Sequence, residues 1–314
     1  MDKNLKSTRD AFGNALISIA KNNKKVYALS ADLKDSLRLS DFANTYPKQF
    51  IECGVAEQNM VGIATGLAAS EKIPFATSFG VFNPGRTWDQ IRVGVCISNL
   101  NVKLVGAHGG LSNHKDGASH QAFEDIAIMR VLPNIKIIVP ADYEQTLKLI
   151  ELTVQDPSPT YIRLSGESTP TISKNTSKIK IGEGEVLKQG KELLVLSYGP
   201  MLNQVLQAID KIGVSATVIN IHTIKPLDTN IITEHINEIK NVITVEDHQI
   251  IGGLGSAVSE LIAENNFKNV KFKRFGINNI FGKSSRKIEE LYKYFELDYT
   301  SLAKNITNFL EEEV

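Results

Sequence analysis

The chain has 314 residues, about twice the usual length of one domain, which favours two domains. Its 35 Lys and Arg residues balance its 35 Asp and Glu residues, which gives no reason to expect a nucleic-acid partner. No apolar run reaches the roughly 18 residues of a membrane span, and residues 1–12 lack the apolar centre of a signal peptide. We therefore expect a cytoplasmic protein with no membrane partner.

Two cysteines, Cys53 and Cys96, are far apart in the chain and have apolar neighbours. Neither belongs to a CxxC pair and neither has clustered histidines beside it, so the sequence predicts free thiols. We also predict that this chain alone forms no metal site.

The first half of the chain alternates between helical and strand patterns. Residues Ser7 to Asp10 resemble a helix start, and apolar residues then recur at helical spacing up to Ala20. Further helices are predicted at 55–69, 88–97 and 143–154, between β-prone runs at 26–29, 50–53, 74–79, 102–105, 136–139 and 160–164. Such alternation is typical of a parallel α/β sheet.

A polar stretch separates this half from a second alternating region. Residues 168–180 are rich in Ser, Thr, Lys and Asn and lack periodicity, which is typical of a linker. Beyond it, strands are predicted at 193–197, 216–221, 242–245 and 271–275, with helices at 202–212 and 257–263 and two more at the end. We predict an α/β protein of two doubly wound domains, 1–167 and a smaller one at 187–314, with a linker at 168–186.

Polar residues follow several of the predicted strands of the first half. Open parallel sheets bind their ligands at the carboxyl ends of the strands, where such residues would gather. The residues concerned are 32–36, Glu57, 79–86 and 108–120, together with Arg163 inside the last predicted strand. We therefore expect a ligand site at this edge of the first sheet.

Glu57 stands near the start of the helical segment 55–69, which is apolar on nearly every side. Helices of this kind are usually buried, and a buried carboxylate needs a hydrogen-bond partner or must be held neutral. The helix dipole also favours an acidic residue in a first turn, so Glu57 alone has a structural alternative. Gly62 and Gly66, one turn apart, would let another helix approach closely.

The glycine-rich segment 107–120 carries three of the six histidines, His108, His114 and His120, together with Asp116. Metal binding is one alternative, but spacings of six residues do not place ligands on one helical face. Neutral imidazoles can both donate and accept hydrogen bonds, which suits substrate hydroxyls and proton transfer. Surface histidines without a function are the remaining alternative.

Arg163 lies in an otherwise apolar predicted strand, 160–164. A guanidinium in such a place is either paired with a carboxylate or reaches an anionic ligand. The sequence leaves both alternatives open.

At these residues the chain resembles the transketolase family. The segment 52–60, Glu-Cys-Gly-Val-Ala-Glu-Gln-Asn-Met, looks like the transketolase segment whose glutamate contacts thiamine diphosphate. Five further segments resemble successive transketolase segments in the same order: 31–36, 88–92, 116–125, 224–228 and 244–248. The resemblance covers essentially the whole chain.

The resemblance implies a role for each candidate residue. Glu57 would contact the aminopyrimidine ring and activate the cofactor for attack on a ketose, and His108 and His120 would share in catalysis. Cofactor binding would further involve Asp32, Phe79 and Phe82. Either phenylalanine could stack on the ring, because 83–86 holds one extra residue. The hydroxyls and the phosphate of the substrate would be bound by Arg9, Ser36, His108, Asp116, His120 and Arg163.

The family's front half is missing from this sequence. In full-length transketolases that half carries a Gly-Asp-Gly motif and an Asn that bind the metal and the diphosphate, and no such motif occurs here. The resemblance thus implies the C-terminal subunit of a two-gene transketolase, with Mg²⁺ or Ca²⁺ bound mainly by an N-terminal partner subunit. We expect a heterotetramer that transfers a two-carbon unit between sugar phosphates in carbohydrate metabolism, as in the pentose phosphate pathway, and a chain that is inactive alone.

Four other classes of protein share some of these features. The β subunit of a 2-oxo acid dehydrogenase has a similar length and a comparable Glu, but its substrate has no sugar phosphate, and 108–120 and Arg163 favour transketolase. Deoxyxylulose-phosphate synthases are normally single chains. A non-catalytic scaffold would be expected to have lost Glu57, Asp116 or His120. The glycines of 252–255 suggest a nicotinamide-dependent oxidoreductase, but the sequence has no GxGxxG motif directly after a predicted strand.

Overall fold

A seven-stranded sheet forms the centre of the first domain in the computed structural model, which describes residues 5–312. The strand order is β12-β6-β7-β5-β4-β2-β3. All neighbours are parallel except β12, which pairs antiparallel with β6. The strands are β2 (Val26–Ser30), β3 (Phe50–Glu52), β4 (Ile73–Phe79), β5 (Lys103–Ala107), β6 (Lys136–Ile138), β7 (Thr160–Arg163) and β12 (Thr223–Lys225).

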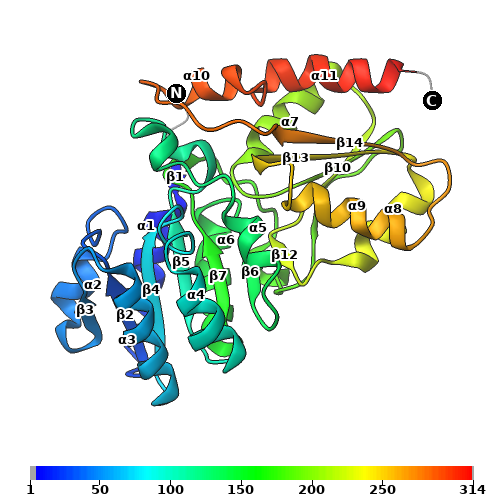
Figure 1. The fold of residues 1–314 in the computed structure, drawn as a ribbon. Helices are drawn as coiled ribbons and strands as arrows, with labels where there is room; N and C mark the ends of the chain where they lie inside the picture. The colour runs from blue at the N-terminus through cyan, green and yellow to red at the C-terminus, as the bar shows by residue number, and fades with distance from the viewer. Residues whose placement is uncertain (1–4, 313–314) are drawn as a thin grey trace.

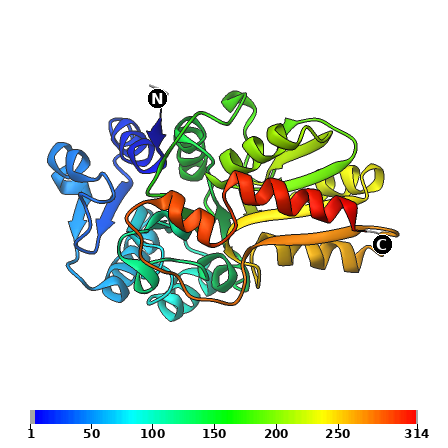
Figure 2. The same cartoon turned by 90° about the horizontal axis from the view of Figure 1, so that it is seen from above.

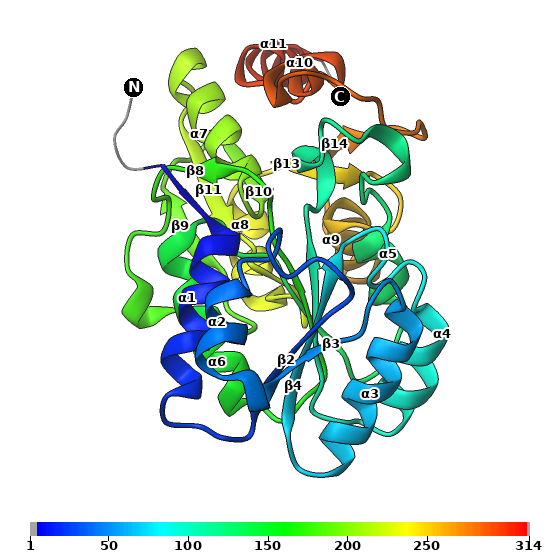
Figure 3. The same ribbon diagram turned by 90° about the vertical axis from the view of Figure 1, so that its left-hand side faces the viewer.

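Helices cover both faces of this sheet (Figure 3). One face carries α1 (Thr8–Ala20), α2 (Ser40–Thr45) and α6 (Tyr143–Gln155), and the other carries α3 (Glu57–Ala69), α4 (Trp88–Gln90) and α5 (Asp125–Arg130). As predicted, Ser7 begins the first helix: its side chain accepts a hydrogen bond from the Arg9 N–H. The sheet is thus buried on both sides, as its apolar strands require.

The C-terminal domain contains a smaller sheet of order β14-β13-β10-β11-β9, in which only β9 is antiparallel. Its strands are β9 (Glu185–Lys188), β10 (Leu193–Ser197), β11 (Ala216–Asn220), β13 (Asn241–Gln249) and β14 (Lys271–Ile277). Its helices are α7 (Met201–Ile212), α8 (Thr229–Glu238), α9 (Leu254–Glu264), α10 (Ile288–Tyr294) and α11 (Tyr299–Glu311). The last two helices lie across the top of the domain in Figure 1.

The two domains share an apolar core. One buried cluster includes Met60 and Val95 of the first domain together with Leu194 and Leu254 of the second. Strand β12 follows β11 of the C-terminal domain in the chain, yet it completes the edge of the first sheet. The second domain is therefore packed firmly against the first.

The predicted α/β class is confirmed, with differences in detail. The helix predicted at 88–97 is a short α4 continued by a π-helical segment, η2 (Ile91–Ile97). Residues 168–186 include β8 (Ser168–Thr169), which pairs with β1 (Lys6–Ser7), and a 3₁₀ turn, η5 (Thr176–Lys178). Within residues 5–312 no helix is both long enough and apolar enough to cross a membrane.

Helix α3 is not buried on every side, contrary to the expectation from its composition. Met60 and Val61 are buried, but Gly62 and Gly66 are exposed, and a Cβ added at either would meet no atom within 4 Å. Part of the surface of α3, although apolar in composition, is therefore not covered by the rest of this chain.

Candidate active site

Glu57 is the first residue of α3 and is only 3% exposed. Its Oε2 accepts a hydrogen bond from Arg86 Nη1 at 2.8 Å, and the Arg86 side chain is about half exposed, at 49%. Arg86 lies in the loop after β4, within the polar segment 79–86 expected at this edge of the sheet, but no role of its own was predicted for it. The only signal for it in the sequence was its place after a strand of the same sheet.

Two phenylalanines connect this carboxylate to the histidine loop. The rings of Phe79 and Phe82 are stacked, with centroids 6.2 Å apart. Phe79 packs in a T-shaped arrangement with His108, with ring centroids 4.6 Å apart, and Phe82 packs in the same way with His120, with centroids 5.3 Å apart. The Arg86 guanidinium lies over the Phe82 ring at 4.6 Å. A cation, two aromatic rings and two imidazoles are therefore contiguous with Glu57.

Arg9 brings together the far side of this cluster. Its Nη1 donates to the Ser36 carbonyl at 2.7 Å and lies 2.8 Å from His108 Nε2, and its Nη2 donates to the Gly166 carbonyl at 2.8 Å. These acceptors are all uncharged, and the Arg9 Nε is buried without a hydrogen-bond partner among residues 5–312. A half-buried cation paired only with neutral groups favours an anionic ligand nearby.

His108 is held neutral in this environment. Burial, and next the neighbouring Arg9 cation, lower the pKa of His108 to about 4. Because Arg9 is always a donor, His108 Nε2 accepts and the ring proton belongs on Nδ1. His108 also has a left-handed backbone, with φ of 55°, which is costly for a residue other than glycine. At neutral pH it can bind hydroxyl groups but carries no charge.

The segment 108–120 folds into two 3₁₀ turns, η3 (Gly110–Ser112) and η4 (Gly117–Ser119). The Nδ1 of His114 lies 3.5 Å from the Glu167 carboxylate. Asp116 is exposed at the start of η4. Of the three histidines, His108 and His120 thus border the aromatic pair.

Arg163 is 3% exposed and all three of its guanidinium nitrogens are bonded within the protein. Nε donates to Asp125 Oδ2 at 2.9 Å, Nη1 donates to Asp247 Oδ1 at 2.7 Å, and Nη2 donates to the Ala122 and Asp247 carbonyls. Burial by itself lowers the pKa of Arg163, but the two carboxylates outweigh it and the pKa stands above its ordinary value. The geometry shows the ion-pair alternative for Arg163, and the site proposed below is built without this residue.

Asp32 is exposed at the carboxyl end of β2, with φ of 60°, and its N–H donates to Glu52 Oε1 at 2.7 Å. Within the described residues its carboxylate makes no hydrogen bond or ion pair with the Glu57 cluster. Asp32 therefore lies at the predicted edge of the sheet without joining the contacts above.

The glycines at 252–255 serve an internal carboxylate. The N–H groups of Leu254 and Gly255, at the start of α9, donate to Glu246 at 2.8 and 2.9 Å. A Cβ at Gly253 would stand 2.1 Å from Glu246 Oε2. Since this helix start is already occupied by Glu246, it does not offer the open phosphate site of a dinucleotide-binding protein.

Fold and site together define a two-domain α/β protein whose candidate site lies at the carboxyl ends of parallel strands. Residues 5–171 match the family model described as the transketolase pyrimidine-binding domain, and residues 182–302 match the transketolase C-terminal domain. The chain belongs to the transketolase family.

Three similar proteins give the relationship more closely. The chain is 42% identical to a putative transketolase C-terminal section of Methanocaldococcus jannaschii, over 98% of both chains. It is 33% identical to one subunit of the apulose-4-phosphate transketolase of Phocaeicola vulgatus, over 99% of this chain and 100% of that one. A solved structure of a split gene transketolase, an inactive β4 tetramer, superposes with a TM-score of 0.87 at 36% identity, over 97% of this chain and 98% of that one. The predicted kinship with C-terminal subunits of split transketolases is confirmed.

Proposed function

We propose that this chain is the C-terminal subunit of a thiamine-diphosphate-dependent transketolase that moves a two-carbon ketol unit from a ketose phosphate to an aldose phosphate. One observation carries the proposal. The buried carboxylate of Glu57 is bonded to Arg86, whose guanidinium lies over Phe82 of the stacked aromatic pair. The other ring of the pair, Phe79, contacts the neutral His108, which in turn contacts the cation of Arg9. Glu57 and the aromatic pair would suit a flat cofactor ring, and Arg9 with His108 would suit an anionic sugar.

The residues present fit one part of the cofactor. Glu57 would hold a ring nitrogen of the aminopyrimidine, and Phe79 or Phe82 would pack on its face. When bound, thiamine diphosphate supplies the carbanion chemistry that breaks the carbon–carbon bond of the ketose. Glu57 would exchange a proton with the ring from a site that is 3% exposed, where water competes little for the carboxylate.

The sugar phosphate would lie against the side of the cluster formed by Arg9 and His108. Arg9 lacks a carboxylate partner among the described residues and would attract the phosphate. His108 and His120 would bind hydroxyl groups, and the exposed carboxylate of Asp116 would accept from another. Ser36 presents its carbonyl to Arg9 and would help to fix that guanidinium.

The diphosphate and its metal need a second polypeptide. Among residues 5–312 no group of three or more His, Cys, Asp and Glu side chains could hold a metal ion. The related solved structure is that of an inactive β4 tetramer, and two of the relatives are named as a C-terminal section and as a subunit of a transketolase. The names of these relatives support an N-terminal partner. In our proposal that partner would hold Mg²⁺ or Ca²⁺ with the diphosphate, in a heterotetramer with two thiamine sites at subunit interfaces.

The substrate class is proposed only as a ketose phosphate. One relative is named as a subunit of an apulose-4-phosphate transketolase, so the proposal does not specify which ketose phosphate this chain uses. The groups at Arg9, His108 and His120 would recognise a phosphate and hydroxyls without selecting one carbon skeleton.

The test is an assay of this chain mixed with its partner subunit, using phosphorylated ketoses with aldose phosphate acceptors in one arm and 2-oxo acids in another. We expect two-carbon transfer in the first arm and no decarboxylation in the second. If the mixture turns over 2-oxo acids but not phosphorylated ketoses, the chain would instead be the β subunit of a 2-oxo acid dehydrogenase. A mixture that is inactive in both arms would favour a scaffold.

A further inference from the structure

The C-terminal domain reaches the histidine loop through a buried carboxylate. Asp247, near the end of β13, accepts from Arg163 Nη1 at 2.7 Å, and its carbonyl accepts from Arg163 Nη2 at 3.1 Å. The same Nη2 donates to the Ala122 carbonyl at 3.2 Å, two residues after His120. A continuous chain of bonds therefore joins Asp247 to the backbone that ends the loop.

The start of the loop packs on the same pair. Gly110 has a φ of +60°, and a Cβ there would stand 1.9 Å from Asp247 Oδ2. At Gly109 a Cβ would stand 2.7 Å from Arg163 Nε. A side chain at either position would collide with Asp247 or Arg163. The backbone directly after His108 therefore lies against the Asp247–Arg163 pair.

A second connection crosses the other end of the loop. Residues 278–287, between β14 and α10, are here called the strap. The Ser285 N–H donates to the His114 carbonyl at 2.7 Å, and Gln121 Nε2 donates to the Lys283 carbonyl at 3.1 Å. Figure 2 shows the strap, in orange, running from the C-terminal domain over the first domain.

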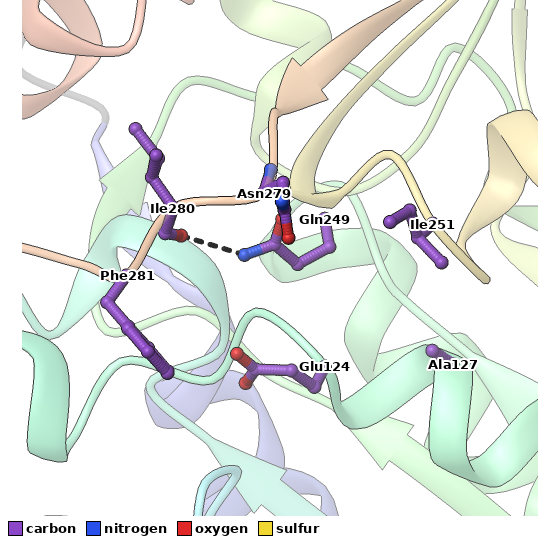
Figure 4. Close-up of a pocket in the computed structure, with 7 residues that line it drawn as sticks. All are labelled: Glu124, Ala127, Gln249, Ile251, Asn279, Ile280 and Phe281. Atoms are coloured by element: carbon purple, nitrogen blue, oxygen red, sulfur yellow. Dashed lines mark hydrogen bonds between the residues drawn. The ribbon is translucent and has the colours of Figure 1, made fainter.

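Gln249 fixes the strap to both domains. Its side chain accepts from the Asn279 N–H at 2.9 Å and donates to the Ile280 carbonyl at 2.8 Å, as Figure 4 shows for the second bond. Its own N–H donates to the Phe123 carbonyl at 2.9 Å. Gln249 lines a groove of about 320 Å³ with Phe281 and Glu124, so its amide stands between the strap and the first domain.

We propose that the C-terminal domain positions the His108–His120 loop, through Asp247 beneath the loop's start and through Gln249 and the strap across its end. These residues are outside the set that would touch substrate or cofactor, so they act as positioning residues. If the loop binds the sugar, as the proposed function holds, the C-terminal domain sets how firmly the sugar is bound.

The first arm of the test does not depend on enzymatic activity. Hydrogen exchange of the amides at 108–121 is measured in the isolated full-length chain and in the Asp247→Asn and Gln249→Ala variants. Asp247→Asn keeps the shape but removes the charge, and Gln249→Ala truncates a partly exposed side chain, so the second variant is expected to fold even if the first does not. Exchange in the loop should be about tenfold faster or more, because the loop opens locally at a lower free energy.

Glu260→Gln is the matched control. Glu260 pairs with Arg130 and also joins the two domains, but it lies on α9, away from the loop. This variant should leave loop exchange unchanged. Loop exchange at the wild-type rate in both Asp247→Asn and Gln249→Ala, or equal acceleration in Glu260→Gln, would overturn the proposal.

The second arm uses the complex with the partner subunit. We expect the two variants to raise the KM for a phosphorylated ketose about tenfold with a smaller fall in kcat, and Glu260→Gln to change neither. An unchanged KM in a folded, active complex would also overturn the proposal. If the wild-type complex is inactive while exchange responds as expected, the positioning role stands and the proposed function fails.

Discussion

The Arg86 guanidinium donates a hydrogen bond to the Glu57 carboxylate at 2.8 Å, and this pair joins the loop after β4 to the start of α3. Glu57 is almost fully buried, so Arg86 supplies the opposite charge that a buried carboxylate requires. Arg86 therefore gives the Glu57 carboxylate a charge-assisted partner within this chain. Cofactor binding would have to share or displace this contact.

Arg86→Ala should destabilise the isolated chain. Without the guanidinium, Glu57 keeps its burial but loses its charge-assisted hydrogen bond, which should lower the free energy of unfolding by about 1–3 kcal/mol. Urea denaturation measures the change. Arg92→Ala, at an exposed position shortly after it in the chain, is the control and should shift the midpoint little. Equal midpoints for wild type and Arg86→Ala would mean that the ion pair does not stabilise the fold.

Glu57→Gln should abolish turnover in the assembled complex without unfolding the chain. The amide keeps the size of the side chain but cannot exchange a proton with the cofactor ring, so kcat should fall at least about 100-fold. Exchange of the thiazolium proton, followed by NMR, should slow in parallel. Glu71→Gln, an exposed carboxylate just after the same helix, should behave as wild type. Proton exchange at the wild-type rate in Glu57→Gln would rule out the role given to this residue.

Arg163→Ala should lower the stability of the fold and, because Arg163 joins Asp247 to the loop, should also raise the KM as Asp247→Asn does. Its removal leaves two buried carboxylates, Asp125 and Asp247, without their common cation, which should lower the free energy of unfolding by about 3–5 kcal/mol. Arg130→Ala, which breaks a single pair with the exposed Glu260, should lower it by about 1 kcal/mol or less. An unfolding midpoint for Arg163→Ala equal to that of wild type would contradict the stabilising role given to the buried ion pairs.

His108 should make the fold less stable in acid. Its pKa is about 4 in the folded chain against an ordinary value of 6.5, so the unfolded chain binds the proton first as the pH falls. The stability that His108 contributes is complete above pH 6.5 and is lost between about pH 6.5 and 4. Between pH 7.5 and 5, wild type should lose about 1–2 kcal/mol more unfolding free energy than His108→Gln.

The comparison with His108→Gln is needed because another buried group titrates in the same range. Burial raises the pKa of Glu246 to about 7, against the opposite effect of hydrogen bonds from the Gly255 and Leu254 N–H groups. Glu246 therefore contributes stability in acid that is lost as the pH rises from about 4.5 to 7. Identical pH dependence in wild type and His108→Gln would contradict the assignment of a neutral, depressed His108.

Local patterns predicted most of the regular elements. The capping side chain of Ser7 and the periodicity after it predicted α1, and β-prone runs predicted β2, β4, β5 and β7. Strand β12 was missed because it forms only by pairing with β6. The residues of β6 that pair with β12 lie more than 80 positions earlier in the chain. The exposed side of α3 was missed because composition does not say what covers a helix.

The sequence named candidate residues for the site but not the contacts among them. The sequence singled out Glu57, His108 and His120, since their residue types are unusual after buried strands. It could not choose between a ligand and an ion pair for Arg163, because Asp125 and Asp247 are 38 and 84 residues away in sequence. Arg86 was missed as the partner of Glu57 for the same reason, at a separation of 29 residues.

The central claim is that this chain contributes only half of a cofactor site. Calorimetric titration of thiamine diphosphate with Mg²⁺ into this chain, into its partner subunit and into their mixture tests it directly. We predict tight binding in the mixture, weaker binding when the chain in that mixture carries Glu57→Gln, and no tight binding to this chain alone. Tight binding to this chain alone, or none to the mixture, would contradict the claim.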